Sequence, residues 1–163
     1  MSNICDMVIA VGTLAGALLI GVTLYLEKKW QRKKYAIDLL SAWNDYTADH
    51  AKEILTMYPQ LRDGEMLSRE ESRMIYLSMS SNTAEWNVRF QIVELLNHAK
   101  AMAVAIDNNV AAEEIIGKSV NKALCAWYEN FKIFLEKAEK INGYQPWKEF
   151  VEYARKREQY KCF

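Results

Sequence analysis

The chain has 163 residues, enough for one domain with an appendage, and its 51% hydrophobic and 26% charged residues exclude a disordered chain. The formal net charge is zero, but residues 27–34 hold five basic residues and one acidic residue, a net charge of +4. Residues 35–163 hold 16 basic and 19 acidic residues, a net charge of −3. This acidic body excludes general nucleic-acid binding, which depends on neutralising phosphates.

The residue 1–34 segment has the pattern of a membrane anchor. Val8 to Leu26 are nineteen residues without a charge, and as a helix they span about 29 Å, close to the roughly 30 Å hydrocarbon core. A cleaved signal peptide would carry its basic residues before the apolar run. Here they follow it, so we expect a retained transmembrane helix, with residues 35–163 as a separate helical domain.

A basic collar sets the expected orientation. The membrane-surface residues are Lys28, Lys29, Arg32, Lys33 and Lys34. Because flanking Lys and Arg stay on the cytoplasmic side, the N-terminus is predicted outside and the C-terminal domain in the cytoplasm.

Small residues recur along the apolar run at helical spacing. Gly12 and Gly16 form a G-x-x-x-G pair, and Thr13, Ala17 and Gly21 form a second ridge beside it. Small side chains let helices in lipid approach closely. We therefore expect a homo-oligomer, whose subunit number the pattern does not give.

The chain contains only six Gly and two Pro, which favours helices. No Gly or Pro interrupts Val22 to Tyr58, so the span is expected to continue into the cytoplasm as one rod. Pro59 and Gly64 mark the first break, and Ser68 with Glu71 forms a capping box for a short helix.

Three more helices are expected after this one. Asn82 and Glu85 are predicted to cap a helix whose apolar face runs from Val88 to Ile106 and which ends at residues 107–109. A long helix then carries apolar residues from Ile116 to Ile141 and stops at Asn142-Gly143. Pro146 is placed in the first turn of the last helix. The fold class is therefore all-α: one transmembrane helix continuing into a cytoplasmic bundle of four or five helices.

We find no catalytic, cofactor or metal constellation. AEEIIGKS, residues 112–119, fits a loose phosphate-loop pattern, but it has no preceding strand and two acidic residues, so we interpret it as helix with a Glu114–Lys118 surface pair. His50 and His98 lack ligand spacing. Trp43, Trp127 and Trp147 lie on apolar faces and are assigned to the core, as is Cys125. We therefore expect no enzyme activity.

One group of residues is a candidate for binding an anionic ligand. Arginine guanidinium groups recognise phosphate, and the candidate residues lie near the two breaks: Arg62, Arg69, Arg73, Trp86 and Arg89. The alternative is that these are scattered, solvated charges.

The order of elements carries a resemblance. The collar EKKWQRKK is followed by YAIDLLSAW, LLNHAKAMAVAIDNNVAAEEIIGKSV, AWYENFKIFLEKAEK and PWKEF. Together with the apolar N-terminus, these resemble a bacterial and phage family of small, N-terminally membrane-anchored helical proteins of unknown function. The family usually shows Asn, an aromatic residue and Glu in the central helix, where this chain has Asn97-His98-Ala99-Lys100. The layout is also similar to that of small membrane effectors of antiviral, CRISPR-type systems.

The resemblance implies a single-pass protein of the bacterial inner membrane. We expect its cytoplasmic domain to sense a ligand, such as a nucleotide messenger, or a protein partner, and to signal to the span as a regulator or antiviral-defence effector. The alternative is a non-catalytic scaffold or accessory subunit of a membrane complex.

Overall fold

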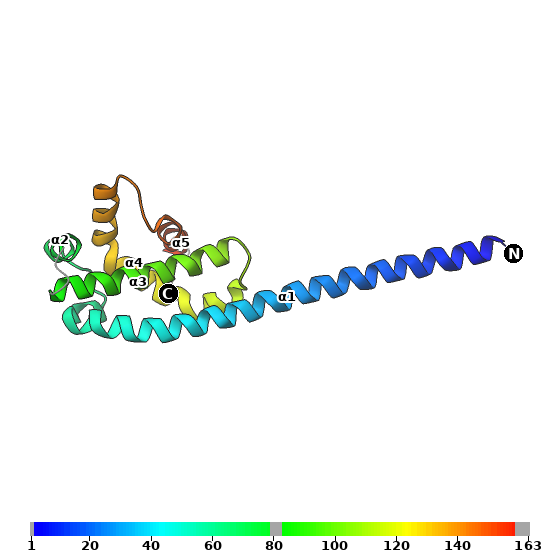
Figure 1. Ribbon diagram of the computed structural model, residues 1–163, viewed down its shortest axis with the longest axis horizontal. Helices are drawn as coiled ribbons and strands as arrows, with labels where there is room; N and C mark the ends of the chain where they lie inside the picture. The colour runs from blue at the N-terminus through cyan, green and yellow to red at the C-terminus, as the bar shows by residue number, and fades with distance from the viewer. Residues whose placement is uncertain (1, 79–82, 159–163) are drawn as a thin grey trace.

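A computed structural model describes residues 2–78 and 83–158, except the side chains of residues 2–12, 15, 118 and 119 (Figure 1). Within these residues the chain is all-helical, which confirms the predicted class. The elements are α1 (Ser2–Met57), a 3-10 helix η1 (Pro59–Asp63), α2 (Arg69–Leu77), α3 (Ala84–Asp107), α4 (Glu113–Asn142) and α5 (Lys148–Glu158).

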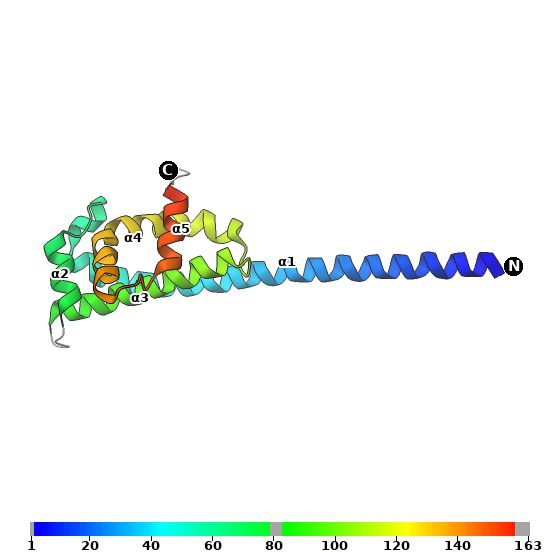
Figure 2. The same ribbon diagram turned by 90° about the horizontal axis from the view of Figure 1, so that it is seen from above.

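The longest element, α1, confirms the uninterrupted rod. It has 56 residues, a length of about 84 Å at the usual helical rise. Its C-terminal part packs against α3 and α4. Its N-terminal part extends alone beyond the other helices (Figures 1 and 2).

The apolar run of residues 8–26 belongs to this isolated part of α1. Residues 8–12, with Gly12, lie outside the described side chains, as does Ala15. Further along the run, Leu14, Leu19 and Ile20 are 67%, 68% and 63% exposed. Among the residues that the structure describes with their side chains, no helix is long and apolar enough to cross a membrane. The helical state of the run is confirmed, and the span itself stays a prediction.

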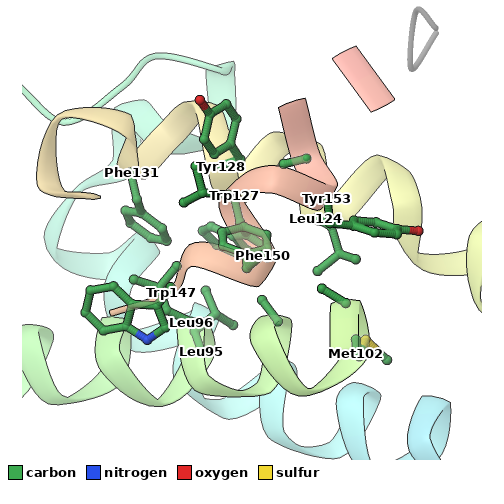
Figure 3. Packing of buried hydrophobic residues seen from close by; sticks show 14 of the residues in the cluster. Leu95, Leu96, Met102, Leu124, Trp127, Tyr128, Phe131, Trp147, Phe150 and Tyr153 are labelled. Atoms are coloured by element: carbon green, nitrogen blue, oxygen red, sulfur yellow. The ribbon is translucent and has the colours of Figure 1, made fainter. Parts of the chain in front are cut away.

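The core lies where α1, α3, α4 and α5 meet. Figure 3 shows Leu95 and Leu96 of α3 and Phe131 of α4 close to Phe150 of α5, and all four are at most 1% exposed. The tryptophans assigned to the core, Trp43, Trp127 and Trp147, are 4%, 8% and 6% exposed, and Cys125 is also buried. The apolar faces expected from helical spacing are therefore buried over most of their length, but Ile141, the last residue of the predicted α4 face, is 48% exposed.

The predicted breaks are also found. Pro59 begins η1, and Gly64 ends it with a φ of 82°. Gly143 ends α4 with a φ of 73°. Both angles lie in the left-handed region that only glycine adopts without strain. The capping box is present, with the Glu71 N–H donating to Ser68 Oγ at 3.2 Å and the Ser68 N–H donating to Glu71 Oε2 at 2.8 Å.

Two helix starts differ from the prediction. Thr83, and not Asn82, is the N-cap of α3, because the Thr83 hydroxyl accepts the Trp86 N–H at 3.2 Å; Asn82 itself lies outside the described residues. Pro146 precedes α5, which begins at Lys148. The Trp147 N–H donates to Gln145 Oε1 at 3.3 Å. The side chain of Gln145 therefore satisfies a backbone N–H at the start of the helix, where the helix itself offers no acceptor.

Candidate functional site

A surface cleft lies between α2 and the start of α3. Its volume is about 780 Å³, and it is lined by Arg69, Glu70, Arg73, Met74, Leu77, Ser78, Thr83 and Glu85. Arg69 and Arg73 are four residues apart on α2, so their side chains leave the same face of the helix. Two of the predicted ligand residues are thus brought together.

The lining combines both charges with apolar surface. Glu70 and Glu85 lie in the same cleft as the two arginines, and Met74 and Leu77 are 56% and 47% exposed. Carboxylates repel a bare phosphate, while exposed apolar side chains favour a partner with apolar atoms. The cleft therefore suits a ligand or peptide with an apolar part and mixed polar groups.

The other three predicted ligand residues do not line this cleft. Arg62 is exposed in η1 and is not among the residues that line the cleft. Trp86 and Arg89 belong to α3 and form a different structure. The cleft thus contains two of the five predicted ligand residues, and a ligand role for the five stays a prediction.

Arg89 joins the end of α2 to the start of α3. Its Nη1 donates to the Ser78 carbonyl at 2.9 Å, and Ser78 is the C-cap of α2. Its guanidinium lies over the Tyr76 ring at 5.2 Å and the Trp86 ring at 5.7 Å. These contacts satisfy a helix-end carbonyl and hold the cation between two aromatic faces.

Tyr58 lies near the carboxylates on this side of the bundle. Burial raises the pKa of its hydroxyl, and the negative charges of Glu71 and Glu85 raise that pKa further. Tyr58 is therefore neutral at physiological pH.

Several cleft residues were missed in the sequence. Glu70, Met74 and Leu77 share the α2 face with the arginines at helical spacing, and that spacing could have indicated them. Thr83 and Glu85 come from across the turn. Only the packing of α3 beside α2 places them in the cleft.

A second hollow lies at the basic collar. It measures about 400 Å³ and is lined by Tyr25, Lys28, Lys29, Arg32, Lys33, Ala112 and Glu114. Four of the five predicted collar residues therefore face one hollow. The fifth, Lys34, lies over the Trp30 ring at 5.7 Å.

The hollow exists because the α3–α4 connection packs on the collar. Arg32 Nη2 donates to Asn109 Oδ1 at 3.2 Å, and the Ala112 N–H donates to the Arg32 carbonyl at 3.3 Å. Lys33 forms an ion pair with Glu114 at 3.7 Å. The expected partner of Glu114, Lys118, has a side chain outside the described part. AEEIIGKS is confirmed as helical from Glu113 onwards, with Ala112 as the N-cap.

The two histidines lie between α1 and α3. His50 Nδ1 hydrogen-bonds Gln91 Oε1, and His98 lies 4.2 Å from the Tyr46 ring, centroid to centroid. Burial lowers the pKa of His98, and His50 lowers it further against the opposing effect of Glu94. Among the side chains that the structure describes, no group of three or more His, Cys, Asp or Glu could hold a metal ion.

The fold defines a class of all-helical proteins in which a long N-terminal helix runs into a compact bundle. The chain belongs to the family described as a domain of unknown function, DUF4760, whose model matches residues 7–157. This confirms the expectation of an uncharacterised family. No curated protein and no solved structure matches the chain.

Proposed function

We propose that this protein is a single-span membrane protein, anchored by residues 8–26, whose helical domain senses a ligand or partner in the cytoplasm and signals to the span. One observation carries the proposal: a single helix, α1, belongs to both parts. Ala36, Trp43 and Ile54 of α1 are 0%, 4% and 0% exposed inside the bundle. A displacement of the bundle core would therefore move the N-terminal part of the same helix.

Two features support a membrane for the isolated part of α1. The exposed large apolar side chains of this part are Leu14, Leu18, Leu19, Ile20, Val22, Leu24 and Leu26. An apolar surface of this size marks a site that a membrane or another molecule covers. The five basic residues of the collar all follow the run. A bacterial inner membrane with the N-terminus outside is the location that agrees with this charge bias.

The cleft between α2 and α3 is the proposed sensing site. It offers two guanidinium groups beside two carboxylates, together with exposed apolar side chains. This lining suits an amphipathic segment of a protein partner, or a nucleotide messenger whose phosphate pairs with the arginines at a distance from the carboxylates. A regulator or an antiviral-defence effector would use the site in this way. The same cleft in a scaffold would hold a partner permanently.

The anchor and its orientation are tested together. A reporter that fluoresces only in the cytoplasm is fused after Phe163, and membranes are washed with alkaline carbonate. We expect a bright fusion that stays in the membrane pellet, because the Lys/Arg bias holds the C-terminal domain inside. A dark fusion would refute the orientation, and a fusion washed into the supernatant would refute the anchor.

The sensing role is tested by native mass spectrometry of the protein purified in detergent, which reports the subunit number and any retained molecule. The double variant Arg69→Ala/Arg73→Ala should lose a retained ligand, whereas Arg62→Ala, outside the cleft, should keep it. Overproduction then separates the two functions. An effector damages the membrane when its trigger is present, and a scaffold does not.

A further inference from the structure

The end of the bundle beside the collar carries a concentrated positive charge. Basic side chains of α1 and α5 meet acidic side chains of α1, α3 and α4 there. The basic residues are Lys28, Lys29, Arg32, Lys33, Lys34, Lys156 and Arg157, and the acidic residues are Glu27, Asp107, Glu113 and Glu114, for a net charge of +3. We call this set the collar face.

Ion pairs on the collar face neutralise three of its acidic groups. Lys33 pairs with Glu114 at 3.7 Å, Lys156 pairs with Asp107 at 3.7 Å, and Arg157 pairs with Glu113. The carboxylate of Glu27 accepts from Gln31 Nε2 at 3.3 Å. The excess positive charge therefore resides on α1, at Lys28, Lys29, Arg32 and Lys34, against the single carboxylate of Glu27.

The α3–α4 connection lies beside these basic residues. Figures 1 and 2 show it next to α1 where that helix leaves the bundle. Asn108, Asn109 and Val110 line one surface hollow with Lys28 and Arg32. Val110 is 49% exposed, so the connection presents an apolar side chain among cationic ones.

Helix geometry sets the depth of this surface if residues 8–26 span a membrane. Arg32 follows Leu26 by six residues, which places it about 9 Å beyond the end of the apolar run. The headgroup layer is about 5–8 Å thick on each side of the hydrocarbon core. Because the backbone of Arg32 accepts the Ala112 N–H, the α3–α4 connection is held at the outer edge of the headgroup layer.

We infer that the collar face is a docking surface for an anionic lipid bilayer, which holds the α3–α4 end of the bundle against the headgroups. The inference rests on the proposed membrane anchor. It adds that the bundle has a fixed orientation to the membrane, with Val110 at the lipid surface and η1 at the far end. Anionic lipids attract basic residues next to a span, and neutral lipids do not.

The experiment uses the full-length chain with Cys5, Cys125 and Cys162 replaced by Ala and a single fluorophore at Val110→Cys. The protein is reconstituted into vesicles of phosphatidylcholine alone or with a third of phosphatidylglycerol, both containing a lipid with a nitroxide on its headgroup. A matched sample carries the fluorophore at Asp63→Cys, on η1. Flotation of the vesicles measures anchoring independently of the fluorescence.

We expect quenching at Val110 to exceed quenching at Asp63 and to increase with phosphatidylglycerol. The variant Lys28→Gln/Lys29→Gln should lower the ratio of docked to undocked bundles by about fivefold for each charge removed. The control Lys137→Gln/Lys140→Gln, on the far half of α4, should leave it unchanged. Salt at 1 M, where the screening length is about 3 Å, should remove the lipid dependence.

The outcomes separate the inference from the proposal beneath it. A chain that floats with both vesicles but whose Val110 fluorophore is quenched equally in each overturns the docking surface and leaves the anchor standing. Equal quenching at Val110 and Asp63 also overturns it. A chain that does not float overturns the anchor, and the docking surface with it.

Discussion

At the scale of single residues, a side chain's surroundings decided its role more than its type. Arg62 and Arg89 are both arginines near a break in the chain. Arg62 is exposed, whereas Arg89 contacts Tyr76, Trp86 and the Ser78 carbonyl. Arg89, a candidate ligand residue in the sequence, is therefore held at the α2–α3 junction by two aromatic rings and a helix-end carbonyl.

Replacing Arg89 by Ala should destabilise the fold. The hydrogen bond to the Ser78 carbonyl involves a charged donor, and its loss together with two cation–π contacts costs about 2 kcal/mol in the free energy of unfolding. This cost is measured by urea unfolding of the full chain in detergent, with circular dichroism as the signal. Arg62→Ala is the control and should change stability by less than about 0.5 kcal/mol. Equal effects of the two changes would contradict the structural role.

His98 should make stability depend on pH in one direction. Its pKa is lowered from 6.5, first by burial, so the unfolded chain takes up a proton at a higher pH than the folded chain does. The stability is therefore full above pH 6.5 and declines as the pH falls from there through the lower, folded pKa. NMR titration of the His98 ring in the native protein gives that pKa directly.

The His98 ring has Tyr46, His50 and Glu94 as its neighbours. Tyr46 and His50 face it from α1. His98→Gln removes the titration and should flatten the decline in stability below pH 6.5. A His98 ring that titrates at or above pH 6.5 would contradict the burial effect.

At the scale of elements, local signals located most helix ends. Gly64 and Gly143 adopt positive φ values, and the Ser68–Glu71 capping box forms as expected. The start of α3 was misplaced by one residue because Asn82 and Thr83 are both good N-caps. The backbone conformation of the turn before α3 decides which of the two side chains accepts the Trp86 N–H.

The small-residue ridge of α1 should mediate self-association. In the single chain, an added Cβ at Gly16 or Gly21 would meet nothing within 4 Å, so Gly16→Ile does not strain the helix itself. In lipid, the larger side chain would hold neighbouring helices apart and weaken association by about 1–2 kcal/mol. The measurement is energy transfer between labelled copies of residues 1–34 in vesicles.

Leu19→Ile is the matched control, since it exchanges one large apolar side chain for another. Equal association of the wild type, Gly16→Ile and the control would show that Gly16 faces lipid. An oligomer would then have to be built by the cytoplasmic helices.

At the scale of the whole molecule, a few long-range contacts close the bundle. Asn130 is 6% exposed, and its Nδ2 donates to the Leu61 carbonyl at 3.3 Å. The backbone carbonyl of Asn130 accepts the Leu67 N–H at 3.0 Å. The segment between η1 and α2 is thereby fixed to the middle of α4.

Asn130→Ala should therefore destabilise the whole bundle. It removes the hydrogen bond from the Asn130 side chain to the Leu61 carbonyl, which keeps the Gly64 N–H as a donor at 3.4 Å. The expected cost is therefore that of one hydrogen bond, about 1 kcal/mol. Glu136→Ala, exposed on the same helix, should have almost no effect. Hydrogen exchange should also show faster opening of residues 61–67 in the Asn130 variant, and unchanged exchange there would count against the contact.

The amino-acid sequence by itself determined the helical class, the single rod and the buried faces. Ala36, Trp43 and Ile54, like Phe131 and Phe150, follow the helical period, and a period is a local property that needs no knowledge of neighbours. The tertiary structure alone decided which helices meet. It placed Glu85 in the same cleft as Arg69, and Arg89 on the Ser78 carbonyl at a helix junction. It also placed Asn109 and Ala112 on Arg32. These pairs are separated by 16, 11, 77 and 80 positions in the chain, and spacing along one helix carries no information about contacts between helices, which depend on how whole faces pack.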